Sequence, residues 1–129
     1  PTSHNRAAWL HVDDHGPAID AVRHRGRIGE TYNVGSGEEA TVDQLATVIL
    51  SALGKPASLR RQVPDRPGHD RRYLLDSTKI RTELGWSPRT CFADGLPATT
   101  AWYIANRAWW EPLLYRSVIN ESDWAAASR

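Results

Sequence analysis

The sequence predicts a mixed α/β fold, in which the end of an α/β sheet adjoins a small helical lobe. Helical patterns alternate with short β-rich segments along the 129 residues. Hydrophobic residues make up 40% of the chain and charged residues 24%, as in ordinary globular proteins, which argues against intrinsic disorder. A chain of this length fits one small domain or a piece of a larger one, and it can bury about two thirds of its unfolded surface.

Charge and composition exclude several classes of protein. Sixteen basic and fifteen acidic residues leave a net charge of +1, too little for a general binder of nucleic acid or of a membrane surface. No apolar run is long enough to span a bilayer and the first residues lack a signal-peptide core, so we expect a cytoplasmic protein. The single cysteine, Cys91, excludes an internal disulfide and a multi-cysteine zinc site. Because methionine is absent, we expect a processed product, an excised domain or an incomplete reading of a longer protein.

Three short segments are rich in β-forming residues: residues 9–12, 31–34 and 59–63. The second is followed by Gly35-Ser36-Gly37, which lacks the third glycine and the following helix of a dinucleotide-binding loop and therefore predicts a turn. The third is expected to be an edge strand that leads into the loop of residues 64–69.

The helix predicted to begin after Thr41 has the clearest local signal. Thr41-Val42-Asp43-Gln44 fits a capping box, in which a threonine hydroxyl and a glutamine side chain satisfy unpaired backbone N–H groups. Apolar residues follow at helical spacing, and Gly54 and Pro56 stop the helix.

Three further helices are expected. The first begins near Pro17, capped by Asp13 and Asp14, and ends at Gly26. Another follows the caps Asp76 and Ser77 and ends at Gly85 in a left-handed conformation, and the last covers about residues 95–107. Trp102, Trp109 and Trp110 could stack on a base, although core packing or a partner surface is the expected role.

Residues 60–72 concentrate five of the chain's fourteen arginines. Guanidinium groups bind phosphate in a bidentate manner, and Gly68 allows the backbone to approach a ligand closely. The functional interpretation is a phosphate or pyrophosphate clamp. The structural alternative is an arginine-rich loop that pairs with Asp65, Asp70 and nearby carboxylates. The residues alone leave both open.

Other chemical motifs are weak. His11 and His15 are four residues apart, a spacing that could bind a metal on one helix, but we expect only His15 near a helix and predict no metal site. Walker, Gly-x-Ser-x-Gly and Tyr-x-x-x-Lys patterns are all absent from the sequence. No catalytic residue and no cofactor-binding residue is therefore predicted in this chain.

Longer motifs resemble a known family. These are Trp-Leu-His-Val-Asp-Asp-His at 9–15, Gly-Glu-Thr-Tyr-Asn-Val-Gly at 29–35, Asp-Arg-Pro-Gly-His-Asp-Arg-Arg-Tyr at 65–73 and Trp-Trp-Glu-Pro-Leu at 109–113. Together they resemble the C-terminal part of the dTDP-glucose 4,6-dehydratase family, within the extended short-chain dehydrogenase/reductase superfamily of NAD-dependent epimerases and dehydratases. The similarity covers roughly residues 9–113.

The resemblance implies a lyase of deoxysugar biosynthesis that converts dTDP-glucose to dTDP-4-keto-6-deoxyglucose. Family members oxidise the sugar at C4, eliminate water across C5 and C6, and return the hydride to C6. Their glycine-rich NAD loop and catalytic residues lie in an N-terminal part that is absent from this chain. We therefore expect NAD to be bound there, and the isolated chain to be inactive. Its protein partner would be the missing Rossmann portion or further copies of itself.

The resemblance also assigns roles along the chain. It implies the end of the Rossmann-type core at residues 1–37, a substrate-binding lobe at 38–114 and a polar tail at 115–129. Arg66 would bind the diphosphate of the dTDP-sugar, in a site lined by Asp65, Pro67, Gly68 and His69. This agrees with the clamp interpretation of the arginine-rich segment.

Two positions depart from the family pattern. Ala7-Ala8 stand where the family has an arginine followed by an acidic residue, and that arginine contacts the substrate in the family. Val42 replaces an asparagine that the family favours. The chain is therefore a diverged or decayed relative, or its first residues are poorly defined. Beside the dehydratase portion, two alternatives remain: a non-catalytic remnant domain that binds a nucleotide sugar or a protein partner, and a related epimerase or reductase for another nucleotide sugar.

Overall fold

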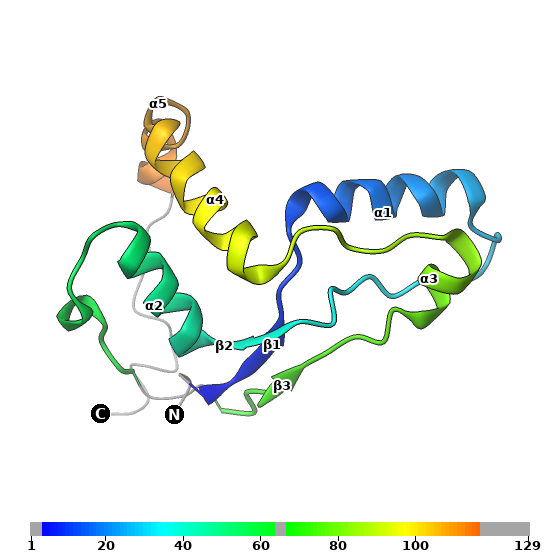
Figure 1. Cartoon of the computed structure of the whole chain (residues 1–129), viewed down its shortest axis with the longest axis horizontal. Coiled ribbons are helices and arrows are strands. Elements are labelled where there is room, and N and C mark those ends of the chain that lie inside the picture. Colours follow the sequence, from blue (N-terminus) through cyan, green and yellow to red (C-terminus); the bar gives the residue numbers. More distant parts are fainter. Residues whose placement is uncertain (1–3, 64–66, 117–129) are drawn as a thin grey trace.

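The computed structural model describes residues 4–63 and 67–116. Within these ranges, three short strands form one mixed sheet in the order β2-β1-β3 (Figure 1). Strand β1 (Arg6–Ala8) pairs antiparallel with β2 (Glu39–Thr41) and parallel with β3 (Arg72–Tyr73). The predicted mixed α/β class is confirmed.

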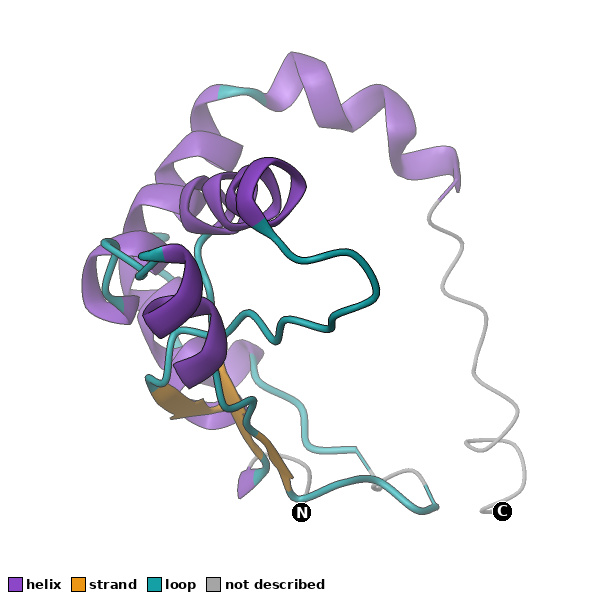
Figure 2. Ribbon diagram, turned by 90° about the vertical axis from the view of Figure 1, so that its right-hand side faces the viewer, coloured by secondary structure: helices purple, strands orange, loops and turns teal. Residues whose placement is uncertain are grey.

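The helices gather into two groups. Helix α1 (Val12–Arg25) packs against α3 (Thr78–Leu84), and α2 (Val42–Ala52) packs against α4 (Phe92–Ala105). The short α5 (Arg107–Trp110) continues α4 beyond Asn106, and 3₁₀ turns form at Ala57–Leu59 and Glu111–Arg116. Figure 2 shows the strands as a small patch beside the helices, with long loops connecting the elements. No helix in the described part of the chain is long and apolar enough to cross a membrane.

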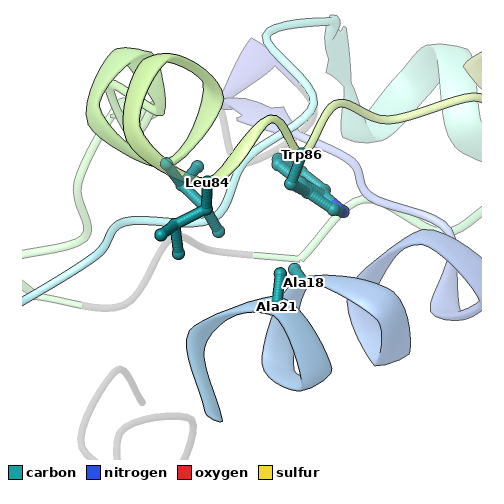
Figure 3. Close-up of a cluster of buried hydrophobic side chains, with 5 residues drawn as sticks. Ala18, Ala21, Leu84 and Trp86 are labelled. Atoms are coloured by element: carbon teal, nitrogen blue, oxygen red, sulfur yellow. The ribbon is translucent and has the colours of Figure 1, made fainter. Parts of the chain in front are cut away.

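The buried core lies between α1 and α3 (Figure 3). Ala18 and Ala21 present small side chains on α1, which allows Ile80, Leu84 and Trp86 to approach closely. Burial of a side chain the size of Ile80 contributes about 1.5–3 kcal/mol. This core positions α1 and the segment that leads from α3 into α4.

The first predicted strand and helix boundary are wrong. Strand β1 lies at residues 6–8 instead of 9–12, and α1 already begins at Val12. Helix α1 begins earlier than predicted because the side chain of His11 accepts a hydrogen bond from the backbone N–H of Asp13. His11 thus caps the N-terminus of the helix. Pro17 therefore lies inside α1, where it forgoes one backbone hydrogen bond.

The other two predicted strands are also wrong. Residues 31–34 form no strand in the described structure, and Tyr32 and Val34 instead pack against the core. Residues 57–59 form a 3₁₀ turn after Pro56, and residues 60–63 follow it without strand pairing among the described residues. A β-rich segment becomes a strand only where another strand lies beside it.

Local capping signals gave better predictions. The Thr41 box is confirmed: the N–H of Gln44 donates to Thr41 Oγ1 at 3.1 Å, and the N–H of Thr41 donates to Gln44 Oε1 at 2.8 Å. Gly85 ends α3 in the predicted left-handed conformation, with φ of 65°.

The capping of α3 and the extent of the last helix differ in detail from the prediction. Asp76 accepts from the N–H of Thr78, whereas Ser77 Oγ donates to the carbonyl of Gly35. The last helix, expected over 95–107, spans 92–105 and breaks at Asn106, whose N–H and side chain both donate to the carbonyl of Trp102.

Candidate functional site

The arginine-rich segment is anchored to α2 at its N-terminal end. Arg60 Nη1 donates to Asp43 Oδ1 at 2.8 Å and to Thr47 Oγ1 at 3.1 Å. Asp43 and Thr47 are one helical turn apart on α2, so a single guanidinium group contacts both. Arg60 is thus occupied by a carboxylate.

The C-terminal end of the segment is anchored to the sheet. The N–H of Arg6 donates to the carbonyl of Arg71 at 2.9 Å, and Arg72 forms a bidentate ion pair with Glu39, with Arg72 Nε 2.7 Å from Glu39 Oε2. This pair reaches from β3 to β2 across β1. The hydrogen bonds from Arg72 hold the pKa of Glu39 below its ordinary value.

Three of the predicted site residues lie in the described structure. Pro67 and Gly68 are exposed, Gly68 has φ of 69°, and His69 is half-buried. His69 Nδ1 lies 3.0 Å from Asn5 Nδ2, and its ring centroid lies 6.2 Å from that of Tyr73. Asp65 and Arg66 fall outside the described residues, so their predicted roles stay predictions.

The structure shows which arginines of the segment pair with carboxylates. Arg60 and Arg72 pair with carboxylates, as the structural alternative requires. Arg61 and Arg71 are exposed and form no ion pair with another residue of the described ranges. The segment is therefore fixed at both ends and carries exposed positive charge between them.

An apolar groove, which the sequence did not predict, lies apart from the arginine-rich segment. Its volume is about 810 Å³. Its lining comes from the start of α1, from α2, and from α4 and α5: Trp9, Leu10, His11, Val12, Asp13, Leu45, Thr90, Cys91, Phe92, Gly95, Leu96, Ala98, Thr99, Trp102, Tyr103 and Trp109.

The tryptophans on the groove are not core residues. Trp102 and Trp109 are 45% and 63% exposed, and their rings meet edge to face at 5.3 Å. Helical periodicity could place these residues on α4 and α5. It could not show that this face stays uncovered, because that depends on how the helices pack.

Asp14, which lies between the two histidines of the weak metal motif, has a structural role. Asp14 is buried, and its carboxylate accepts hydrogen bonds from the N–H groups of Arg89 and Thr90 instead of capping α1. Within the described ranges, no group of three or more His, Cys, Asp or Glu side chains could hold a metal.

The glycine turn at residues 35–37 does not fit a dinucleotide. The Arg81 guanidinium donates to the carbonyl of Ser36, and β2, not a helix, follows the turn. A pyrophosphate loop needs backbone N–H groups at the start of a helix, so this turn does not fit the pyrophosphate of NAD.

The chain is similar to known proteins. The family model described as GDP-mannose 4,6 dehydratase matches residues 2–99. The chain belongs to this family. A dTDP-glucose 4,6-dehydratase of Streptomyces niveus is 60% identical over 110 residues, covering 85% of this chain and 33% of the relative. The corresponding Streptomyces griseus enzyme is 51% identical over 110 residues, covering 85% of this chain and 34% of that protein.

Solved structures of dehydratases share the fold. DesIV, a dTDP-glucose 4,6-dehydratase of Streptomyces venezuelae with NAD and TYD bound, matches with a TM-score of 0.81 and 48% identity, over 88% of this chain and 35% of that one. The Bacillus anthracis dTDP-glucose 4,6-dehydratase in complex with NAD matches with a TM-score of 0.80 and 42% identity, over 88% and 36%. The fold is thus a portion of the extended short-chain dehydrogenase fold, and the chain spans about a third of the length of these relatives.

Proposed function

We propose that this chain is the substrate-binding C-terminal portion of a dTDP-glucose 4,6-dehydratase, a lyase of deoxysugar biosynthesis. The observation that carries the proposal is the 60% identity to the Streptomyces niveus dehydratase, in a chain whose arginine-rich segment is anchored at both ends. In this proposal Arg66 binds the diphosphate of the dTDP-sugar. Asp65, Pro67, Gly68 and His69 line the same site, and residues 38–114 form the lobe that carries it.

Anchoring supports a binding role for this loop. Arg60 holds one end to α2 and Arg72 holds the other to β2, so the loop between them loses less conformational freedom when a ligand binds. Exposed Arg61 and Arg71 add positive charge near the proposed diphosphate. Guanidinium groups suit this ligand because they donate two hydrogen bonds to one phosphate group.

We propose that NAD binds to another part of the enzyme. Relatives crystallised with NAD are about two and a half times as long as this chain, and the glycine turn at residues 35–37 does not fit a dinucleotide. Residues 1–37 would complete the Rossmann-type portion that carries the cofactor. We therefore expect the chain alone to bind the nucleotide sugar without converting it.

Exposed apolar side chains support a second candidate function, which is a non-catalytic domain that packs against a protein partner. Ile19 and Val12 on α1 are 57% and 72% exposed, and Ile28 is fully exposed. Apolar surface of this kind marks contact sites in folded proteins. The partner would be the Rossmann portion of a dehydratase or another copy of the chain.

Calorimetric titration with dTDP-glucose tests the first candidate. We expect saturable binding by the wild-type chain, and loss of binding in Arg66→Ala. Arg23→Ala is the matched control, because this exposed arginine lies on α1, away from the segment of residues 60–72 (Figure 1). Equal binding by wild type and Arg66→Ala would refute the clamp.

Two further experiments separate weak binding from absence of the missing portion. Restoring Arg at position 7 and Asn at position 42 should strengthen binding if those departures matter. Mixing the chain with the N-terminal two thirds of the Streptomyces niveus relative, NAD and dTDP-glucose should yield the 4-keto product. Product formation by the chain alone would contradict the proposal that catalysis requires the N-terminal portion.

A further inference from the structure

The apolar groove between the start of α1, α2 and α4 takes no part in the proposed binding of a nucleotide sugar (Figure 1). Its walls are close-packed. Helix α2 packs against α4, and a Cβ atom at Gly95 on α4 would lie only 3.1 Å from the ring of His11. A groove with such walls keeps its shape when a partner binds, which lowers the cost of binding.

The lining of the groove suits apolar side chains better than a charged ligand. The described residues that line it include no lysine and no arginine, so a nucleotide diphosphate finds no cation there. Polar groups of the lining already bond within the chain. The indole N–H of Trp9 donates to the carbonyl of Ala40 at 3.1 Å, and the hydroxyl of Thr99 donates to the carbonyl of Gly95 at 2.9 Å.

The aromatic side chains on the groove leave much apolar surface in water. Trp9 is 36% exposed, Trp102 45%, Tyr103 49% and Trp109 63%. Aromatic side chains dominate the energetics of protein contacts, and a contiguous exposed patch of them marks a contact site. The groove volume of about 810 Å³ exceeds that of any single side chain, so it accepts several side chains of a partner.

The comparison with the relatives points to the partner. The matched part of the Streptomyces niveus dehydratase is 33% of that protein, so about two thirds of such an enzyme lies outside the match. The wall of the groove that starts at Trp9 follows β1 directly. A segment that precedes β1 in the whole enzyme would therefore join this lobe within about 10 Å of the groove, the length of three strand residues.

We infer that the groove is the contact surface for the N-terminal portion of the dehydratase, whose apolar side chains pack on Trp9, Trp102 and Trp109. This inference rests on the proposed function, which supplies the partner. The contact removes the exposed aromatic surface from water and leaves the arginine-rich segment to the nucleotide sugar.

Fluorine nuclear magnetic resonance of the chain labelled with 5-fluorotryptophan tests this contact. Single tryptophan-to-phenylalanine substitutions assign the six signals. Adding the unlabelled N-terminal two thirds of the Streptomyces niveus relative should shift the signals of Trp9, Trp102 and Trp109 and reduce their change between H₂O and D₂O. Trp86 is the internal control, because it is 6% exposed in the core and should not respond. Unchanged groove signals with a portion that binds NAD would overturn the inference.

Two alanines on α4 provide matched variants. Both are exposed, but Ala98 lines the groove and Ala93 does not. Ala98→Arg places an unpaired charge in the contact and should weaken binding of the N-terminal portion at least about tenfold, measured by calorimetric titration. Ala93→Arg should leave the affinity within about twofold. Equal affinities of the two variants would overturn the inference, and circular dichroism checks that both fold.

Joining the N-terminal portion to residue 1 of the chain gives a second test in a single polypeptide. The three groove signals should then differ little between H₂O and D₂O, as for buried indoles. Protection that depends on protein concentration would assign the groove to a second copy and overturn the inference. Conversion of dTDP-glucose is measured separately. Activity with exposed groove tryptophans overturns this inference alone, whereas covered tryptophans in a protein that binds no dTDP-glucose support it and refute the proposed function.

Discussion

The indole Nε1–H of Trp86 donates to the main-chain carbonyl of Asp14 at 3.0 Å, although the two residues are 72 positions apart. Both residues are buried. The side chain of Asp14 accepts from the N–H groups of Arg89 and Thr90 at 3.0 and 2.9 Å. Asp14 therefore joins α1, through its backbone and its carboxylate, to the segment between α3 and α4.

Replacing Asp14 should destabilise the fold. Asp14→Ala removes a carboxylate that satisfies two backbone donors, and hydrogen bonds to charged groups are among the stronger ones. We expect a loss of about 2–4 kcal/mol in the free energy of unfolding, measured by urea denaturation. Asp13→Ala is the control: its carboxylate is 83% exposed, and the expected change is within about 0.5 kcal/mol. Equal effects of the two substitutions would contradict this role.

Acid should weaken the same contact. Burial opposes ionisation of Asp14, but backbone hydrogen bonds from Thr90 and Arg89, with smaller help from the Thr90 side chain and His11, outweigh it and lower the pKa. A carboxyl whose folded pKa lies below its unfolded pKa stabilises the fold above the unfolded value. This stability is lost as the pH falls from about 4 through the folded pKa.

The pH dependence can be isolated with Asp14→Asn, which does not ionise. The difference in unfolding free energy between wild type and Asp14→Asn should be constant from pH 7 to pH 5. It should then shrink progressively below about pH 4. Glu30, Glu39 and Asp76 also have lowered pKa values, but they are present in both proteins and cancel in the difference. A difference that stays constant down to pH 2.5 would contradict the assignment to Asp14.

Local signals in the sequence predicted local structure well. The capping box at Thr41 and the left-handed Gly85 depend on neighbours within a few residues, so the sequence contains all the information. The β-rich segment 31–34 failed because a strand needs a pairing partner, and pairing is a property of the tertiary structure.

For the candidate site too, the sequence predicts local features but not tertiary contacts. The arginine-rich segment was evident from its composition, but its pairing with Asp43 and Glu39 depends on where α2 and β2 lie. Asn5 carried no signal at all, because its contact with His69 spans 64 positions. The sequence does not predict the groove, because an apolar helix face is expected to be buried. Here that face remains open.

Gly85 should lose stability when it is replaced by alanine. It has φ of 65° with open space at its Cβ position, so Gly85→Ala suffers only conformational strain, about 1 kcal/mol of destabilisation. Thermal unfolding followed by circular dichroism measures this loss, and an unchanged or higher melting temperature would contradict the left-handed conformation of Gly85.

Exposed apolar surface should make the chain self-associate. Trp109 is 63% exposed beside the groove, and Ile28 is fully exposed elsewhere. Sedimentation velocity should show a sedimentation coefficient that rises with concentration, because association removes apolar surface from water. A single monomeric species at every concentration would refute this expectation. Trp109→Arg and Ile28→Arg add the same charge at different places, so a larger drop in association for Trp109→Arg would assign the contact to the groove, and equal drops would assign it to net charge.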